Sequence, residues 1–322
     1  MLKRLALQFL SLIVLLTYSA IICAAQSTTS DNKNDGKLRI VCFGAHPDDA
    51  EYKSGGTAAM WAKLGHHVLL VSVTNGDIGH WKMAGGELAK RRTAESAEVA
   101  KRLGVTSRVL DIHDGELLPT LENRKTICKI IREWNADIVI SHRPWDYHPD
   151  HRYTGILVQD AAFMVTVPFF CPDVPHLKKN PVFLYSSDRF TKPYPFTADV
   201  VVAVDGVFDQ KVDALTALVS QAFEGGAGGS AERLALVPPA SAPQERKAWL
   251  HERWARRQGG EANRFREELI RAYGLEIGSK VKYAEAFEIC EYGARPSKKR
   301  LQELFPFYGT EEARITVSGN IY

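Results

Sequence analysis

From residue 38 onward, short apolar runs alternate with stretches in which apolar residues recur every three or four positions. The apolar runs predict buried strands over 38–45, 67–74, 108–112 and 137–141. The intervening stretches predict helices over 55–64, 87–103 and 121–134. Five residues of the second helix are spaced to share one face: Leu88, Ala94, Ala97, Ala100 and Leu103. Strands that are apolar throughout and alternate with helices favour an α/β fold, with a Rossmann-like, mostly parallel sheet flanked by helices.

The pattern changes after residue 223. The glycine-rich run 225–230 predicts a flexible break, and the proline-rich run 236–243 predicts an irregular bend. Charged helices are expected over 244–257 and 261–273, followed by a last strand over 283–292. We interpret the basic stretch 251–257 as a solvated helix face. The sequence therefore predicts a single domain over 38–322, with a core at about 38–225 and a C-terminal insertion and extension over 226–322.

The N-terminus has the order of segments that is typical of a secretory signal peptide. Lys3 and Arg4 precede an apolar run over 5–22, and small residues follow at 23–25. Cleavage after Ala25 would leave a polar linker over 26–37, a mature chain without a membrane span, and a periplasmic or extracellular location. The alternative is that the leader is retained as a membrane anchor, because the apolar run is almost long enough to span a bilayer.

Charge and cysteine content exclude several classes of protein. The formal charge of +3 falls to +1 when Lys3 and Arg4 leave with the leader, so nothing indicates binding to nucleic acid or an anionic membrane. The four cysteines beyond the leader lie far apart and do not form a disulfide framework. Cys42 and Cys128 are expected to be buried free thiols. No pattern in the sequence indicates an oligomeric state.

Polar clusters follow three of the predicted strands. His46-Pro47-Asp48-Asp49 comes after the first strand, residues 75–77 after the second, and residues 142–151 after the fourth. The carboxyl ends of parallel strands meet at one edge of a sheet, so we expect these clusters to converge there. Together they can supply two histidines and one carboxylate to a metal and leave a coordination position open for water, which is typical of a catalytic zinc.

The chain resembles the PIG-L/LmbE-like N-deacetylases in several motifs. These are His46–Asp49, Gly55–Thr57, Thr74–Asp77, Arg92–Glu95, Leu103–Val105, Asp114–Gly115 and the His-Pro-Asp-His run at 148–151. The resemblance covers about 38–225 and extends more weakly into the tail. It implies a zinc hydrolase that removes acetyl groups from N-acetylglucosamine-like sugars, with ferrous iron as the second candidate metal.

The resemblance also implies roles for individual residues. His46, Asp49 and His151 would hold the metal, and Asp48 would be the general base. His148 would be the general acid or would stabilise the oxyanion, and Arg92 would help to bind the sugar. The chemistry makes compatible demands, because amide hydrolysis needs an activated water, a polarised carbonyl and a proton for the leaving amine. Asp150 is placed to orient a histidine.

Two other functions remain open at this point. His46, Asp48 and His151 also satisfy the two-histidine, one-carboxylate triad of non-haem Fe(II) oxygenases. We understand that triad to lie on an antiparallel barrel, which the alternation of helices and strands opposes. The chain could also be a non-catalytic carbohydrate-binding protein on the same fold. For Arg92, a solvated position on its helix is the alternative to a sugar contact.

Overall fold

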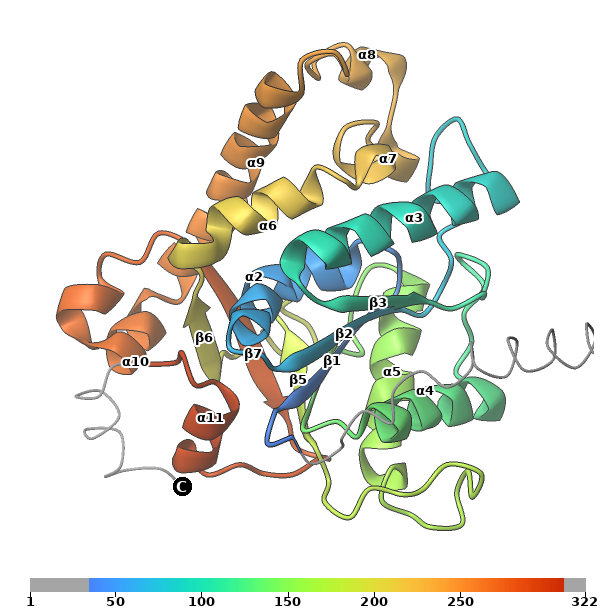
Figure 1. The fold of residues 1–322 in the computed structure, drawn as a ribbon, viewed down its shortest axis with the longest axis vertical. Helices are drawn as coiled ribbons and strands as arrows, with labels where there is room; N and C mark the ends of the chain where they lie inside the picture. Colours follow the sequence, from blue (N-terminus) through green and yellow to red (C-terminus); the bar gives the residue numbers. More distant parts are fainter. Residues whose placement is uncertain (1–34, 310–322) are drawn as a thin grey trace, which may run out of the picture. The chain divides into compact units, whose positions relative to one another are not determined.

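The computed structural model describes residues 35–309, and in this range seven strands form one sheet in the order β3-β2-β1-β4-β5-β7-β6 (Figure 1). The strands are β1 (Arg39–Gly44), β2 (His67–Ser72), β3 (Thr106–Val109), β4 (Ile138–Ser141), β5 (Val182–Ser186), β6 (Val200–Ala203) and β7 (Ala284–Cys290). The first five strands are parallel, and β7 runs antiparallel to both β5 and β6. The predicted α/β fold with a mostly parallel sheet is confirmed.

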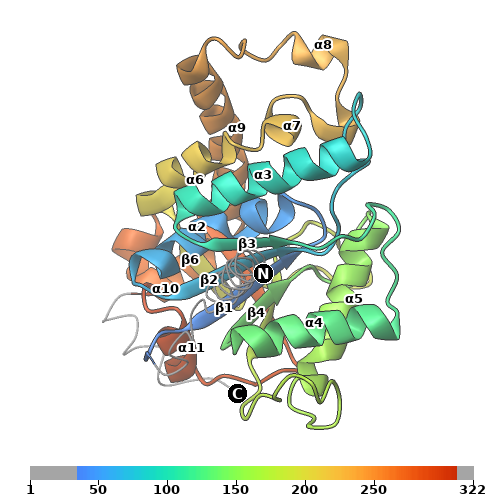
Figure 2. The ribbon, with the colours of Figure 1, turned by 45° about the vertical axis from the view of Figure 1, so that its right-hand side comes forward.

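Ten α-helices and two short 3-10 turns accompany the sheet within the described residues. They are α2 (Asp49–Lys63), α3 (Gly86–Leu103), α4 (Leu121–Trp134), α5 (Pro149–Met164), η1 (Asp205–Val207), α6 (Phe208–Leu215), α7 (Val219–Ala222), η2 (Gly226–Gly228), α8 (Ala231–Leu234), α9 (Pro243–Arg264), α10 (Arg266–Gly278) and α11 (Lys298–Leu304). The helices α2, α3 and α6 lie on one side of the sheet, and α4 and α5 lie on the other (Figures 1 and 2).

Alternate residues of each central strand enter two different cores. Ile40 and Cys42 of β1 pack in the cluster that includes residues of α2, α3 and α6, whereas Val41 and Phe43 pack with residues of α4 and α5. Because both faces of the strand are covered, every residue of β1 is buried. This explains why the strands read as apolar runs without alternation.

The C-terminal segment is part of the sheet, because β7 lies between β5 and β6. Glu285 of β7 is 3 % exposed and accepts hydrogen bonds from the backbone N–H groups of Gly56 and Thr57 at 2.9 and 2.8 Å. The ammonium group of Lys211 lies 2.7 Å from the same carboxylate. A Cβ at position 56 would lie 2.9 Å from the Glu285 carboxylate and 3.0 Å from Val204, so glycine favours this close approach of α2 to β7.

Several boundaries differ from the prediction. The helix α2 begins at Asp49 rather than at 55. Gly56, which weakens its helical pattern, lies at the close contact with β7. The strands β5 and β6 and the helices α5 and α6 were not predicted. The segment predicted as a flexible break is packed: Gly225 and Gly226 have positive φ angles, and Gly226 accepts a hydrogen bond from the Trp81 N–H at 3.0 Å.

The predicted signal peptide and most of the linker lie outside the described residues. Among the helices that the structure does describe, none combines the length and the apolar character needed to cross a membrane. All four described cysteines are buried and free, in agreement with the absence of a disulfide framework in the sequence.

Candidate active site

The predicted clusters meet at the carboxyl edge of the sheet because β1 and β4 are neighbours. His46 follows β1 directly, and Asp49 opens α2. His148 and His151 follow β4, where His148 is the N-cap of α5 and His151 lies in its first turn. In the sheet, β2 lies on one side of β1 and β4 lies on the other. The site therefore lies at the point where the strand order reverses.

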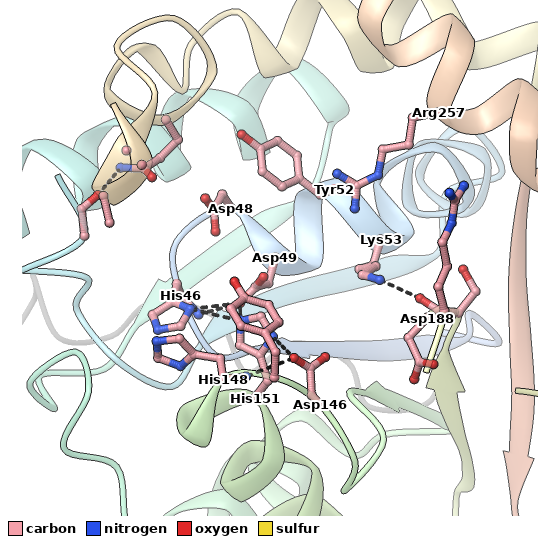
Figure 3. A pocket seen from close by; sticks show the side chains of 18 of the residues that line it. His46, Asp48, Asp49, Tyr52, Lys53, Asp146, His148, His151, Asp188 and Arg257 are labelled. Atoms are coloured by element: carbon pink, nitrogen blue, oxygen red, sulfur yellow. Dashed lines mark hydrogen bonds and ion pairs between the residues drawn. The ribbon is translucent and has the colours of Figure 1, made fainter. Parts of the chain in front are cut away.

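Three side-chain atoms form a nearly equilateral triangle in this site (Figure 3). His46 Nδ1 lies 3.2 Å from His151 Nε2, and Asp49 Oδ2 lies 3.3 Å from each of these nitrogens. Nitrogen and oxygen ligands at about 2.0–2.1 Å from a tetrahedral zinc lie about 3.3 Å from one another. The expected metal ligands are therefore together, at a spacing that fits one metal ion.

Carboxylates surround the two histidines. His46 Nε2 lies 3.0 Å from Asp114 and 3.3 Å from Asp150, and His151 Nδ1 lies 3.0 Å from Asp146. Asp150 thus contacts a histidine, as expected, and the contact fixes which nitrogen of His46 faces the triangle.

This negative surrounding is visible in the pKa values of both histidines. Burial alone would lower the pKa of His46, but its hydrogen bonds to Asp114, Asp150 and Asp49 raise it well above the usual range. Burial also opposes the charge on His151, yet the charge of Asp49 and the hydrogen bond to Asp146 raise its pKa to about 9. The same negative potential would stabilise a divalent cation.

Asp48 is next to the triangle, but its carboxylate turns to Arg92. Asp48 Oδ2 lies 3.4 Å from the Arg92 guanidinium, which also donates to the Gly76 carbonyl at 3.1 Å. Burial raises the pKa of Asp48, while the charge of Arg92 acts against this increase. Arg92 is 2 % exposed, so the solvated alternative for this residue is wrong. Its contact with a sugar stays a prediction.

His148 lies beside His46, with ring centroids 4.6 Å apart at right angles. Its Nδ1 accepts a hydrogen bond from the backbone N–H of Asp150 at 3.2 Å, which places the proton of the neutral ring on Nε2. Burial and the charges of His46 and His151 lower the pKa of His148. The ring is therefore held as a neutral donor.

Sequence reasoning gave no role to several residues of the site. His142 stacks on His151 with centroids 4.3 Å apart and accepts the backbone N–H of Ala45 at 3.1 Å. Asp146 orients His151, and Asp114 orients His46. Asp146 and His142 lie in the loop after β4, whose polar character was the signal that could have found them.

The site opens into a cavity of about 1050 Å³. His46, Asp48, Asp49, His148 and His151 line one end of it. The walls continue through Tyr52 and Lys53 of α2, the loop 187–190, the turn 225–228 and part of α9. A sugar larger than one residue fits in this volume, which lies at the upper end of the usual range for small-molecule sites.

Fold and site together define an α/β protein with a cluster of histidines and carboxylates that could hold a metal ion, in a cavity at the carboxyl edge of its sheet. Residues 41–162 match the PIG-L family model, described as GlcNAc-PI de-N-acetylase. The resemblance found in the sequence motifs is confirmed.

Individual proteins extend this comparison. The chain is 35% identical over 159 residues to a diacetylchitobiose deacetylase of Thermococcus kodakarensis, a match that covers 48% of the chain and 59% of that relative. The structure of an N,N'-diacetylchitobiose deacetylase from Pyrococcus horikoshii covers 86% of this chain and 92% of its own, with a TM-score of 0.59 at 23% identity. A 4-carboxy-2-hydroxymuconate hydratase from Pseudomonas putida has the same fold at 20% identity, with a TM-score of 0.61, and covers 81% of this chain and 98% of its own.

Proposed function

We propose that this protein is a metal-dependent hydrolase that removes the acetyl group from an acetamido sugar, with zinc as the metal. The observation that carries the proposal is the triangle of His46 Nδ1, Asp49 Oδ2 and His151 Nε2, which fits one metal ion beside a carboxylate that is not part of it. The similarity to a diacetylchitobiose deacetylase supports the choice of an acetamide as substrate.

Zinc, when bound, would polarise the amide carbonyl and lower the pKa of a coordinated water to about 7. Asp48 would take the proton of the attacking water as general base. It lies at the cavity wall, and the Arg92 guanidinium contacts its carboxylate at 3.4 Å. Once protonated, Asp48 can return that proton to the leaving nitrogen, which balances the reaction: the C–N bond breaks, acetate leaves and the amine gains the proton.

Of the two roles expected for His148, the geometry supports stabilisation of the oxyanion. A general acid would need a proton on both ring nitrogens, but Nδ1 accepts the Asp150 N–H. The neutral ring can donate from Nε2 to a negative oxygen without losing its proton.

The similarity to a hydratase provides a second candidate reaction on the same site. Hydration of an unsaturated acid also uses a general base that activates water, a role that a carboxylate can fill. Acetate release separates the two reactions, because a hydratase releases no product fragment. The oxygenase alternative receives no support from the fold, since the sheet at the site is parallel.

The decisive experiment combines metal content with acetate release. The chain over 26–322 is purified, bound metal is quantified, and acetate is assayed on a panel of N-acetylated sugars, with His46→Ala as control. We expect one zinc ion per chain and acetate release that the variant loses. Acetate release that persists in a metal-free variant, or no release from any acetamido sugar, would contradict the proposal.

We further propose that residues 1–25 direct export and that the substrate is an extracytoplasmic glycan. Expression of the full chain, followed by N-terminal sequencing of the exported protein, tests this. A start at Gln26 is expected, and a protein that stays in the cytoplasm with its leader intact would contradict it.

A further inference from the structure

The cavity has a second end that the proposed reaction does not use. It is lined by Arg253, Trp254, Arg256, Arg257 and Gln258 of α9, together with residues of the loop 187–190. Figure 3 shows Arg257 pointing into the same cavity as the metal cluster, with Tyr52 between Asp48 and Arg257. A ligand whose acetamide reaches His46 can therefore extend toward α9.

Three arginines of α9 are placed to act together. Arg253, Arg256 and Arg257 follow the i, i+3, i+4 spacing that puts side chains on one helix face. The Arg253 guanidinium lies 4.6 Å from the ring centre of Trp249, and that of Arg257 lies 4.9 Å from the ring centre of Trp254. Among the residues that the structure describes, no carboxylate forms an ion pair with any of these three arginines.

The acidic residues at this end of the cavity are already paired with other cations. Asp188 lies 2.7 Å from Arg143, Glu285 lies 2.7 Å from Lys211, and Glu261 lies 3.5 Å from Arg189. The α9 arginines thus leave a local excess of positive charge. Burial, and in addition the charge of Arg257, lower the pKa of Lys53, which is consistent with that excess.

A buried acceptor at the same place also has no partner. Gln258 is 3 % exposed and donates from Nε2 to Glu285 at 3.2 Å, but its Oε1 accepts no hydrogen bond in the described structure. A buried oxygen without a donor is costly, and a ligand hydroxyl would satisfy it. This end of the cavity therefore offers an acceptor for a sugar hydroxyl next to a group of unpaired arginines.

We propose that the α9 arginines bind an anionic substituent, a carboxylate or a phosphate, on the acetamido sugar or on the unit attached to it. The inference rests on the proposed deacetylase function and narrows its substrate class to acidic acetamido sugars. Arginine suits the task because its planar guanidinium can donate two parallel hydrogen bonds to a carboxylate or phosphate. These arginines are exposed, in agreement with the solvated helix face expected from the sequence, and they also line the cavity.

The first test compares charged and neutral substrates. Acetate release is measured with N,N'-diacetylchitobiose as the neutral sugar, N-acetylmuramic acid as the carboxylate and N-acetylglucosamine 6-phosphate as the phosphate. We expect kcat/KM to favour one of the acidic sugars by about tenfold or more, mainly through KM. The preferred acidic sugar identifies whether the site binds a carboxylate or a phosphate. Equal kcat/KM for neutral and acidic sugars would overturn the proposal.

The second test assigns that preference to α9. In Arg257→Gln, and more strongly in a variant with all three arginines changed to glutamine, the ratio of acidic to neutral kcat/KM should fall toward one. Arg271→Gln is the matched control, because this arginine is exposed on α10 and pairs with Glu268 outside the cavity. A preference that survives in both arginine variants would contradict the assignment. The single variant keeps the test valid if the triple variant does not fold.

A binding measurement separates this inference from the proposed reaction. Inorganic phosphate is titrated into the His46→Ala variant, and the heat of binding is measured by calorimetry. This measures binding at the arginine end of the cavity while catalysis at the metal end is absent. Binding that is lost when Arg257→Gln is added supports the anion site even if no acetamido sugar releases acetate, in which case only the reaction is wrong. Acetate release without phosphate binding, and without a preference for either acidic sugar, would retain the reaction and reject the anion site.

Discussion

His46 and His151 lie 105 positions apart in the chain, yet Nδ1 of the first and Nε2 of the second are 3.2 Å apart. Two nitrogens at this distance, with Asp49 Oδ2 at 3.3 Å from each, form a partly buried site with strong negative potential. Such a site gains stability when a cation fills it.

Zinc should therefore stabilise the folded protein. At about a hundredfold excess over its dissociation constant, the metal should add about 2.7 kcal/mol to the free energy of unfolding of chelator-treated protein. His151→Ala should lose most of this gain. Urea unfolding with and without zinc measures both values, and an equal gain in the variant would show that the metal binds elsewhere.

Asp48→Asn should separate metal binding from turnover. The amide is isosteric and Asp48 is outside the triangle, so bound zinc should stay at the level of the wild type. Loss of the base should lower kcat by about 10²–10⁴-fold. Metal analysis and acetate release on the same preparation check the prediction. A fully active Asp48→Asn would remove this residue as the base.

The buried contact of Arg92 with Asp48 should stabilise the folded protein as well as hold the Asp48 carboxylate in position. Arg92→Leu leaves the carboxylate of Asp48 without its cation and should cost about 3 kcal/mol of unfolding free energy. Arg91 is the matched control on the same helix, because its ion pair with Glu224 is partly exposed, and Arg91→Leu should cost about 1 kcal/mol or less. Denaturant unfolding of both variants measures these losses of unfolding free energy. Equal losses in the two variants would contradict the structural role of Arg92.

The pair of Glu285 and Lys211 should show strong coupling in a double-mutant cycle. Each single change, Glu285→Gln or Lys211→Met, leaves a buried charge without its partner and should cost about 3–5 kcal/mol. The double variant should lose less than the sum, since neither charge remains. Additive losses in urea unfolding would show that the two side chains do not stabilise one another.

The four thiols of the chain over 26–322 should be inert in the folded protein. Burial raises the pKa of Cys42 and Cys290, and it raises that of Cys128 to about 12, so the reactive thiolate is scarce at pH 8. A thiol reagent should label no cysteine until denaturant is added, when all four react. Rapid labelling of the native protein would contradict their burial.

The metal end of the site could be predicted because its residues form short motifs directly after strands. The buried face of α3 could not be predicted, because the residues that are buried there are polar and contact polar partners. Apolar spacing along the helix does not identify them. Ala94 and Ala97 are exposed, whereas Glu95 and Ser96 are buried, with Ser220 at 2.6 Å and Glu51 at 2.5 Å as their partners. Those partners come from segments that are distant in the sequence, so no local pattern indicates them.

The same reason explains what was missed after residue 165. The strands β5 and β6 follow irregular segments, so no helix pattern comes directly before them to continue the alternation of helices and strands. The arginines of α9 are exposed as expected, but a helix pattern does not show which cavity the helix covers. Their place depends on β7, which brings Glu285 next to Gln258.

The position of β7 in the sheet has a consequence for the order in which the protein can be completed. The edge strand β6 joins the sheet through β7, which is made more than eighty residues after it. A growing chain on the ribosome can pair β1 to β5 early, but β6 must wait until residues 284–290 have emerged. The edge strand β6 and the contact of α9 with β7 are therefore completed last, so a chain cut short before residue 284 should be degraded rather than accumulate.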